Sequence, residues 1–337
     1  MAMSDYRLAV SRTNNAIAVL EHSRDQAWSE SYTGEGWWPT WRPGGNQLAA
    51  SVVTRPGGTG GRSVLQLVDL ASGGRLDIPG SAMAPARLIA DRLAHYPIWA
   101  PDGRSLSYVS PAGRALASRV WETGEASERT VMGGAPIFTT WSADATKLAI
   151  HHGGSLTVVD TATWQEQRIS DNAAGFRTAM FTADGSIVFG EPGPTGVSLV
   201  MTSLLDGERR QGRSYAGGLA FAPHPAIGPT LLGITPGDEA GVFSEIVVFD
   251  PNAPASEPRR FLKGPIMAFW WSPDGERLAV LAPSYTGDGR FQVRFHRSDG
   301  TFERAMEPTT LSQDMRTLVS FFDQYAMSHA LWSADSR

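Results

Sequence analysis

The sequence predicts an all-β protein, and within that class a β-propeller of seven four-stranded blades. Three observations lead to this prediction. The 337 residues include 36 glycines and 22 prolines, which indicates many turns and few long helices. A short motif, made of an aromatic residue, a tight turn and an apolar strand, recurs along the whole chain. The last copy lacks its second strand, and the N-terminus begins with a matching one.

The clearest copy of the motif is FWWSPDGERLAVLA, residues 269–282. In its turn, Pro273 presets φ for the second position of a type I turn, Asp274 tolerates the third, and Gly275 takes the left-handed conformation that restarts a strand. Residues 277–281 then have the composition of a strand. The preceding Trp271 is large enough to pack between neighbouring sheets.

Aromatic residues recur at the position of Trp271, and we call them anchors. Their spacings of 58, 42, 40, 40, 50 and 61 residues are about the length of a four-stranded blade plus loop insertions. A second signature, an apolar strand that ends in Asp, appears at residues 65–70, 156–160 and 246–250. Each unit is therefore expected to run from strand A, which ends at the anchor, through strands B, C and D. The anchors are Trp41, Trp99, Trp141, Phe181, Phe221, Trp271 and Trp332.

The two ends of the chain are expected to share the closing blade. Trp332 is followed by only five residues, whereas YRLAVSR at residues 6–12 matches the strand that follows the anchor at 271. Strand A would come from the C-terminus and strands B to D from residues 6 to about 33. Such closure removes free sheet edges, so we expect one propeller domain over residues 1–337. Pro223-His224-Pro225 replaces Pro-Asp-Gly in the fifth copy, which leaves six blades as the alternative.

The pattern W-S-P-D-G-x-x-L-A at residues 271–279 resembles the repeat of TolB-like β-propellers, also called WD40-like or PD40 repeats. The resemblance covers essentially the whole chain. It implies the architecture and leaves the function open, because this family includes both periplasmic partner-binding proteins and the propellers of prolyl-oligopeptidase-like enzymes.

Composition excludes several classes of function. The formal net charge of -5 argues against binding of nucleic acid or anionic membranes. The chain has no cysteine, which excludes disulfides and thiolate catalysis. No apolar window reaches about 18 residues, so we expect no membrane insertion. The N-terminal residues do not resemble a signal peptide, and we expect a cytoplasmic protein as given, or a periplasmic one if a leader precedes it.

In a propeller, the loops from strand D to the next strand A and those from strand B to strand C emerge on one face, which is the usual ligand site by analogy. The residues just before the anchors make this face aromatic. An insertion at residues 307–327 has helical spacing at Met315, Leu318, Phe321 and Phe322 and is expected over the same face. Packing between blades and a plug for the channel are the structural alternatives. The predicted ligand-binding residues are Trp37, Trp38, Tyr96, Asp323, Gln324, Tyr325 and His329.

The sequence predicts a non-catalytic propeller that binds a protein segment or a small organic ligand at this face. No G-x-S-x-G elbow and no metal-ligand spacing are present, so we expect no metal and no cofactor. The alternative is a lyase, isomerase or hydrolase with its active site at the channel mouth. Its acid-base or oxyanion groups would be His95, Arg177 and His329, since imidazoles titrate near neutral pH.

Overall fold

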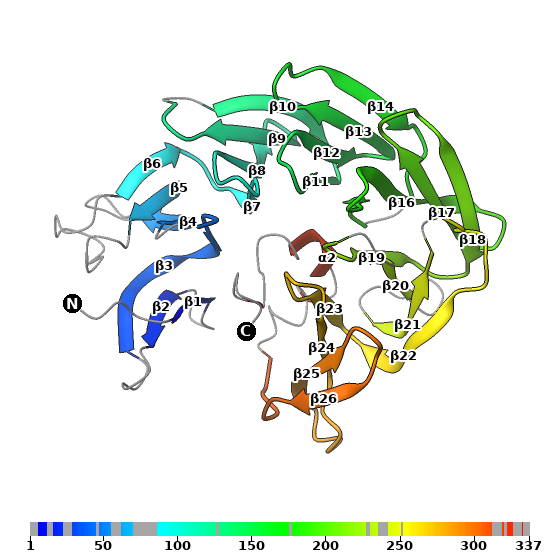
Figure 1. Ribbon diagram of the computed structural model, residues 1–337. Helices are drawn as coiled ribbons and strands as arrows, with labels where there is room; N and C mark the ends of the chain where they lie inside the picture. The colour runs from blue at the N-terminus through cyan, green and yellow to red at the C-terminus, as the bar shows by residue number, and fades with distance from the viewer. Residues whose placement is uncertain are drawn as a thin grey trace. The chain divides into compact units, whose positions relative to one another are not determined.

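The computed structural model is an all-β protein made of consecutive antiparallel sheets (Figure 1). This confirms the predicted fold class. The chain divides into two compact units, unit 1 (residues 1–137) and unit 2 (residues 138–337). No described helix is long and apolar enough to cross a membrane. The structure describes residues 6–11, 16–22, 29–44, 47–54, 62–69, 86–125, 128–174, 177–226, 230–234, 242–250, 252–311, 319, 322–325 and 332.

Unit 1 holds three successive sheets. The long strand β3 belongs to two of them, because its first part pairs with β2 and its second part pairs with β4. The third sheet contains β7 to β10. The strands are β1 (Tyr6–Ser11), β2 (Ala16–His22), β3 (Ser29–Trp41), β4 (Gln47–Thr54), β5 (Arg62–Asp69), β6 (Ala86–Ala90), β7 (His95–Trp99), β8 (Ser105–Ala112), β9 (Ala115–Glu122) and β10 (Glu128–Gly134).

Unit 2 holds four sheets of four strands, and in each sheet the strands follow one another in chain order. A four-residue helix, α2 (Phe322–Tyr325), contacts β19 and β23. The strands are β11 (Ile137–Trp141), β12 (Lys147–His152), β13 (Ser155–Asp160), β14 (Glu166–Ser170), β15 (Met180–Phe181), β16 (Ser186–Gly193), β17 (Gly196–Ser203), β18 (Arg209–Tyr215), β19 (Leu219–Pro223), β20 (Thr230–Ile234), β21 (Phe243–Phe249), β22 (Arg259–Ile266), β23 (Ala268–Trp271), β24 (Arg277–Pro283), β25 (Phe291–Arg297) and β26 (Phe302–Ala305).

The described residues form seven sheets when the two parts of β3 are counted separately. The fifth repeat, which the sequence marks as the weakest, forms the complete sheet β19 to β22. Seven blades are therefore confirmed against six. The predicted strands over residues 6–33 are β1, β2 and the first part of β3. The C-terminal strand that was expected to join them lies outside the described residues, apart from Trp332.

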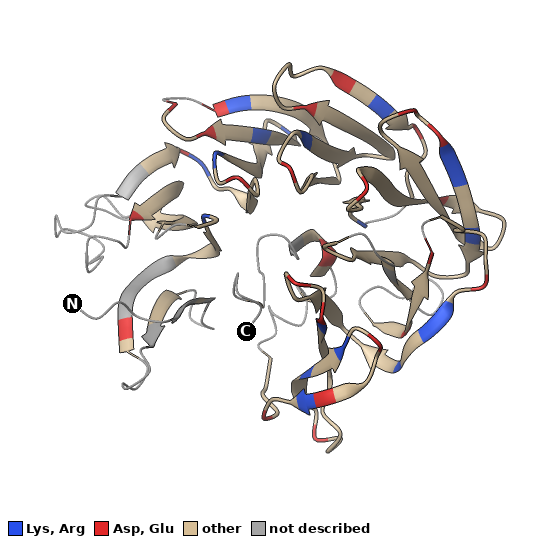
Figure 2. Ribbon diagram, in the orientation of Figure 1, with Lys and Arg blue, Asp and Glu red and all other residues tan. Residues whose placement is uncertain are grey.

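Charge is segregated across the sheets of unit 2. The first strands, β11, β19 and β23, lie on the inner side of the row of sheets, and the fourth strands, β14, β18 and β22, lie on the outer side (Figure 1). The first strands of the unit, β15 included, contain no charged residue. The fourth strands carry arginine, with one in β14, three in β18 and two in β22 (Figure 2). Charged side chains on an edge strand oppose pairing with other chains.

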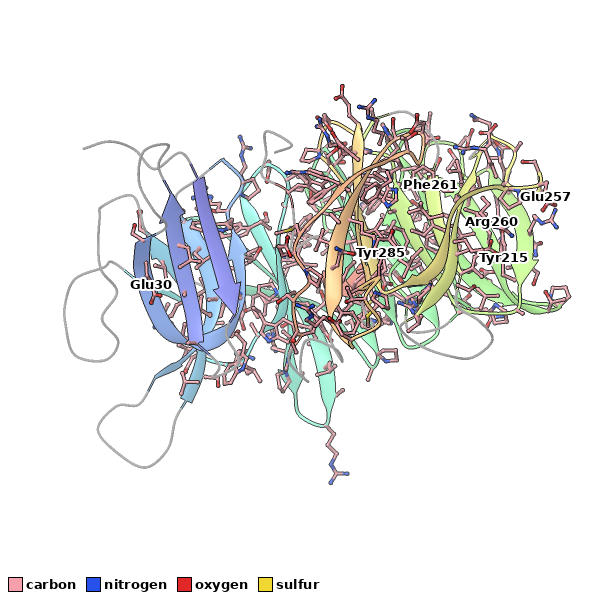
Figure 3. All side chains as sticks on the ribbon, turned by 90° about the horizontal axis from the view of Figure 1, so that it is seen from below. Glu30, Tyr215, Glu257, Arg260, Phe261 and Tyr285 are labelled. Carbon is pink, nitrogen blue, oxygen red and sulfur yellow. The ribbon has the colours of Figure 1, made fainter. Side chains whose placement is uncertain are left out.

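Ion pairs on the outer side of unit 2 occur both between sheets and within one sheet. Arg213 of β18 pairs with Glu257, which precedes β22, at 2.5 Å. Arg260 of β22 pairs with Glu245 of β21 at 2.8 Å. Glu257, Arg260 and Tyr215 lie on the same side of unit 2 (Figure 3). These exposed pairs contribute little to the free energy of unfolding individually.

The repeat turn forms as its sequence predicts. The Gly275 amide donates to the Ser272 carbonyl at 2.8 Å, and Gly275 has a φ of 72°. The Asp274 carboxylate accepts from the Ser272 hydroxyl at 2.5 Å and from the Glu276 amide at 3.0 Å. The Trp271 indole donates to the Ala222 carbonyl of the preceding sheet at 3.0 Å. The anchor therefore packs between sheets, as predicted.

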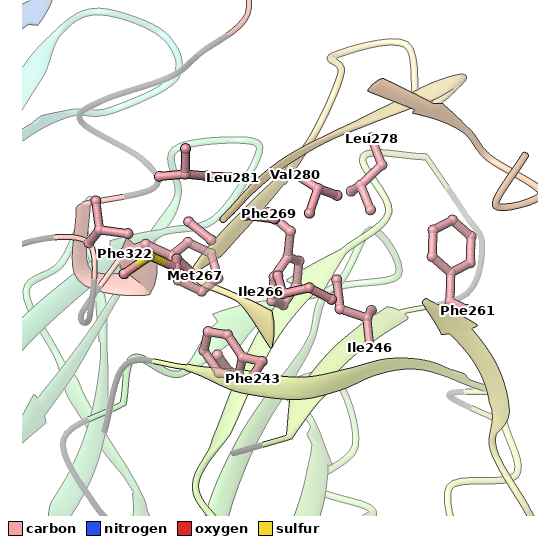
Figure 4. Packing of buried hydrophobic residues seen from close by; sticks show 14 residues of the cluster. Phe243, Ile246, Phe261, Ile266, Met267, Phe269, Leu278, Val280, Leu281 and Phe322 are labelled. Carbon is pink, nitrogen blue, oxygen red and sulfur yellow. The ribbon is translucent and has the colours of Figure 1, made fainter. Parts of the chain in front are cut away.

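The largest described apolar cluster lies between the last two sheets of unit 2 (Figure 4). Phe322 of α2 is at one end of this cluster and Phe261 is at the other. Phe243 and Phe269 are fully buried between them. The cluster joins α2 to the sheets and fixes the position of its side chains.

Candidate functional site

Unit 1 brings together three of the predicted site residues, Trp38, His95 and Tyr96. Trp38 precedes the anchor Trp41 by three residues, and Tyr96 precedes Trp99 by three. Both have left-handed backbones, with φ of 61° and 51°. The register of each strand shifts at the same place, between Trp37 and Thr40 in β3 and between His95 and Ile98 in β7. Bulges of this kind redirect side chains.

The rings of Trp38 and Tyr96 contact each other, with centroids 5.2 Å apart. The His95 ring lies 6.1 Å from that of Trp38. We call Trp38, His95 and Tyr96 the aromatic triplet. All three side chains, and Trp37, are half-buried. The triplet joins two sheets, as the packing alternative requires, and also leaves ring surface in contact with solvent.

The left-handed backbone at Trp38 and Tyr96 is energetically unfavourable. Bulky residues rarely adopt positive φ, and each such residue costs about 1–3 kcal/mol. Strain at the same repeat position in two successive sheets is typical of a binding or active site. Burial lowers the pKa of His95, so the imidazole of His95 is neutral at neutral pH and offers one donor and one acceptor.

Unit 2 brings together Arg177 and Asp323, which are 146 residues apart in sequence. The Arg177 guanidinium donates to one carboxylate oxygen of Asp323 at 2.9 Å, and the Thr178 amide donates to the other at 2.8 Å. The Asp323 side chain is 0 % exposed and that of Arg177 is 10 % exposed. A buried carboxylate is stable only when its oxygens are paired and hydrogen-bonded, and both conditions hold here.

Three rings surround Phe322, the neighbour of Asp323. Their centroids lie 4.8 Å away for Phe269, 5.5 Å for Trp270 and 5.6 Å for Phe243. We call these three residues the aromatic socket. Arg177 also lies over the Phe243 ring, at 5.2 Å from its centroid. The charged and the apolar parts of this site are therefore in direct contact.

His151 of β12 supports Arg177 from the other side. Its Nδ1 lies 2.8 Å from the Arg177 carbonyl, so Nδ1 carries the proton and donates it. Its Nε2 is buried and has no hydrogen-bond partner among the described residues. Burial lowers the pKa of His151, while the backbone of Arg177 and Ala173 and the charge of Asp323 act in the opposite direction. His151 and His152 are the last two residues of β12.

The remaining predicted site residues are placed only in part. Gln324 is buried in α2. Tyr325 ends α2, and His329 lies outside the described residues, as do Met315, Leu318 and Phe321 of the expected helix. His95 belongs to unit 1 and Arg177 to unit 2. No group of three or more His, Asp or Glu side chains suited to a metal ion occurs among the described residues.

Sequence reasoning assigned no role to two residues of these sites. Thr178 contributes only its amide, which no side-chain pattern reveals. His224 stands in the irregular turn of the fifth repeat. Its Nε2 lies 3.0 Å from the Gly275 carbonyl in the next turn, and its ring is 5.0 Å from that of Trp271. The departure from Pro-Asp-Gly therefore supplies a contact between sheets.

Comparisons with known proteins agree with this architecture. No family model and no curated protein matches the sequence. The β-propeller domain of the Trilobed protease from Pyrococcus furiosus is similar in structure, with a TM-score of 0.54, 13% identity, and coverage of 82% of this chain and 85% of that one. TolB from Acinetobacter baumannii has a TM-score of 0.50, 14% identity, and coverage of 90% and 79%.

An enzyme is also among the similar structures. Oligogalacturonate lyase from Vibrio parahaemolyticus has a TM-score of 0.51, 14% identity, and coverage of 79% of this chain and 75% of that one. At these identities the likeness shows the β-propeller fold alone.

Proposed function

We propose that this chain is a TolB-like propeller without catalytic activity, and that it binds a small organic ligand or a protein segment at the aromatic triplet. The W-S-P-D-G repeat and the likeness to a TolB structure support the family. The observation that carries the function is the repeated left-handed backbone at Trp38 and Tyr96. Strain in two bulky residues persists only where the surrounding structure enforces it.

The chemistry of the triplet favours an organic ligand with flat or apolar surface. Trp38 and Tyr96 provide ring faces on which such a ligand can stack. His95 adds one donor and one acceptor close to those rings. A few polar groups among apolar walls are typical of sites for organic ligands.

The state of Arg177 supports the absence of catalysis. The enzymatic alternative requires this guanidinium to stabilise charge on a substrate. Its NH1 atom is instead ion-paired with the Asp323 carboxylate, and the side chain is largely buried. A guanidinium that is already neutralised offers less stabilisation to a developing oxyanion than an open one.

The test compares Trp38→Ala and Tyr96→Ala with Trp164→Ala. Trp164 is an apt control because it is also half-buried and has a φ of 61°, but it lies in the turn between β13 and β14. Native mass spectrometry of gently purified protein measures the mass of any bound species. We expect a species that remains on the unaltered chain and on Trp164→Ala, and that is lost from Trp38→Ala and Tyr96→Ala. Retention by Trp38→Ala, or equal loss from Trp164→Ala, contradicts the proposal.

A further inference from the structure

We propose that the inner side of unit 2 is a recognition site for a peptide segment in which an aromatic residue directly precedes an acidic one. In the structure the chain's own Phe322 and Asp323 occupy this site. A partner segment of the same chemistry takes their place. This inference rests on residues of unit 2 and is independent of the aromatic triplet.

The carboxylate of Asp323 is matched by donors on the protein. Each oxygen of Asp323 has its own donor, the Arg177 guanidinium at 2.9 Å and the Thr178 amide at 2.8 Å. The first strands around the site carry no charge. A largely buried arginine in such surroundings needs an anion, because an unpaired buried charge is strongly destabilising. The site therefore selects a carboxylate.

The aromatic socket lies beside the carboxylate and holds the Phe322 ring. Phe322 is 2 % exposed, and it meets the Phe243 ring at an interplanar angle of 90° and the Trp270 ring at 75°. Edge-to-face contacts of this kind add to the free energy of burial. A large flat ring fills the space between these side chains, so the position before the carboxylate is specific for an aromatic residue.

Phe322 and Asp323 bind to this site as a short linear motif does. The helix α2 has four residues, and a helix of this length is not stable without its contacts. Two adjacent side chains of α2 make the ion pair and the ring contacts. Binding energy that is concentrated in one aromatic and one charged residue is characteristic of hot spots in peptide recognition.

Competition by the tethered segment determines how the site behaves. A segment on the same chain acts at an effective concentration of roughly millimolar. An external peptide therefore binds weakly while Phe322 and Asp323 are in place, and binds more tightly once they are removed. Release of the segment is the event that opens the site to a partner.

The experiment uses the full chain and a synthetic peptide with the sequence of residues 319–325. Fluorescence anisotropy measures its dissociation constant for the unaltered chain and for the double variant Phe322→Ala, Asp323→Asn. We expect binding at least about tenfold tighter to the double variant, because the tethered competitor is gone. The tighter binding is lost when the peptide carries Asn in place of its Asp. It is also lost when Arg177→Leu is added to the double variant. Arg210→Leu, which removes an exposed arginine paired with Glu208, leaves it unchanged.

Three results overturn the proposal. Equal affinity for the unaltered chain and the double variant shows that the segment does not compete. Binding that persists without Arg177 or without the peptide carboxylate shows that the site does not recognise the acid. If thermal melts show that the double variant is unfolded, the binding experiment is repeated with the single variant Asp323→Asn. Failure of that variant to fold as well shows that the segment is an integral part of the core.

Discussion

At the scale of single residues, the presence or absence of a Cβ at one position of the repeat turn changes the free energy of unfolding. Its fourth position has φ of 68° in Gly103, 82° in Gly185 and 72° in Gly275. The third repeat keeps this geometry with an alanine, since Ala145 has φ of 61°. A residue with a Cβ pays about 1–2 kcal/mol for the left-handed conformation. Glycine adopts it without that cost but loses more chain entropy on folding.

We expect Ala145→Gly to raise the free energy of unfolding by about 0.5–1 kcal/mol, because relief of strain exceeds the added entropy loss. The matched change Gly275→Ala should lower it by about 1–3 kcal/mol. At position 275 the backbone has a positive φ, and an added Cβ would also overlap the imidazole of His224. Urea denaturation followed by tryptophan fluorescence measures both values. A loss of stability in Ala145→Gly would show that the turn is not strained.

At the scale of elements, the docking of α2 depends on a histidine that stays neutral. His151 is 3 % exposed and donates to the carbonyl of Arg177, the residue that pairs with Asp323. Burial lowers the pKa of His151 below its usual value near 6.5. Protonation is therefore easier in the unfolded chain than in the folded one. Stability is full above the unfolded pKa and declines as pH falls through 6.5 toward the lower folded pKa.

We expect the melting temperature of the protein to fall as pH is lowered from about 7.5 to 5.5, and His151→Gln to reduce this slope. Glutamine can donate to the same carbonyl but does not titrate. His95, His152 and His296 also have lowered pKa values because of burial, so a smaller slope remains in the variant. Differential scanning fluorimetry across this pH range measures both slopes. Equal slopes would show that His151 does not contribute.

The elements of the fold could be predicted from the sequence, whereas the contacts of the site could not. Each anchor and turn has a local signature. The pattern of residues 271–275, compared along the chain, therefore sufficed to locate the strands. Positive φ at Trp38 and Tyr96 has no such signature, because the sequence suggests glycine or asparagine there. Arg177 and Asp323 were both candidates, but their pairing joins segments 146 residues apart and depends on how α2 docks. The role of His224 could not be predicted, because this residue stands where the repeat motif has Asp and no pattern indicates its contact with the next turn.

At the scale of the whole molecule, side chains beside the repeat turns donate to backbone carbonyls of a neighbouring sheet within each unit. The Arg42 guanidinium donates to the Gly103 carbonyl at 2.7 Å in unit 1, and the Trp271 indole donates to the Ala222 carbonyl in unit 2. The Trp332 indole donates to the Trp270 carbonyl at 3.2 Å, and its ring lies 5.4 Å from that of Phe295. Trp332 thus packs on the sheet β23 to β26 as an anchor of the next strand A would.

The shared closing blade remains a prediction of the sequence. Because the chain has no native cysteine, one introduced pair of cysteines can test it. Trp271 is opposite Leu278 and Trp270 is opposite Ala279. The same register in the last repeat puts Leu331 opposite Ala9, at a spacing that suits a disulfide. We expect Ala9→Cys with Leu331→Cys to oxidise to one intramolecular bond, seen as the loss of two hydrogens in the intact mass and as faster migration on a non-reducing gel. Val10→Cys with Leu331→Cys is the control, because neighbouring side chains on a strand point to opposite faces. Oxidation of the control pair alone, or of neither pair, would mean that the C-terminal segment does not pair with β1 in this register.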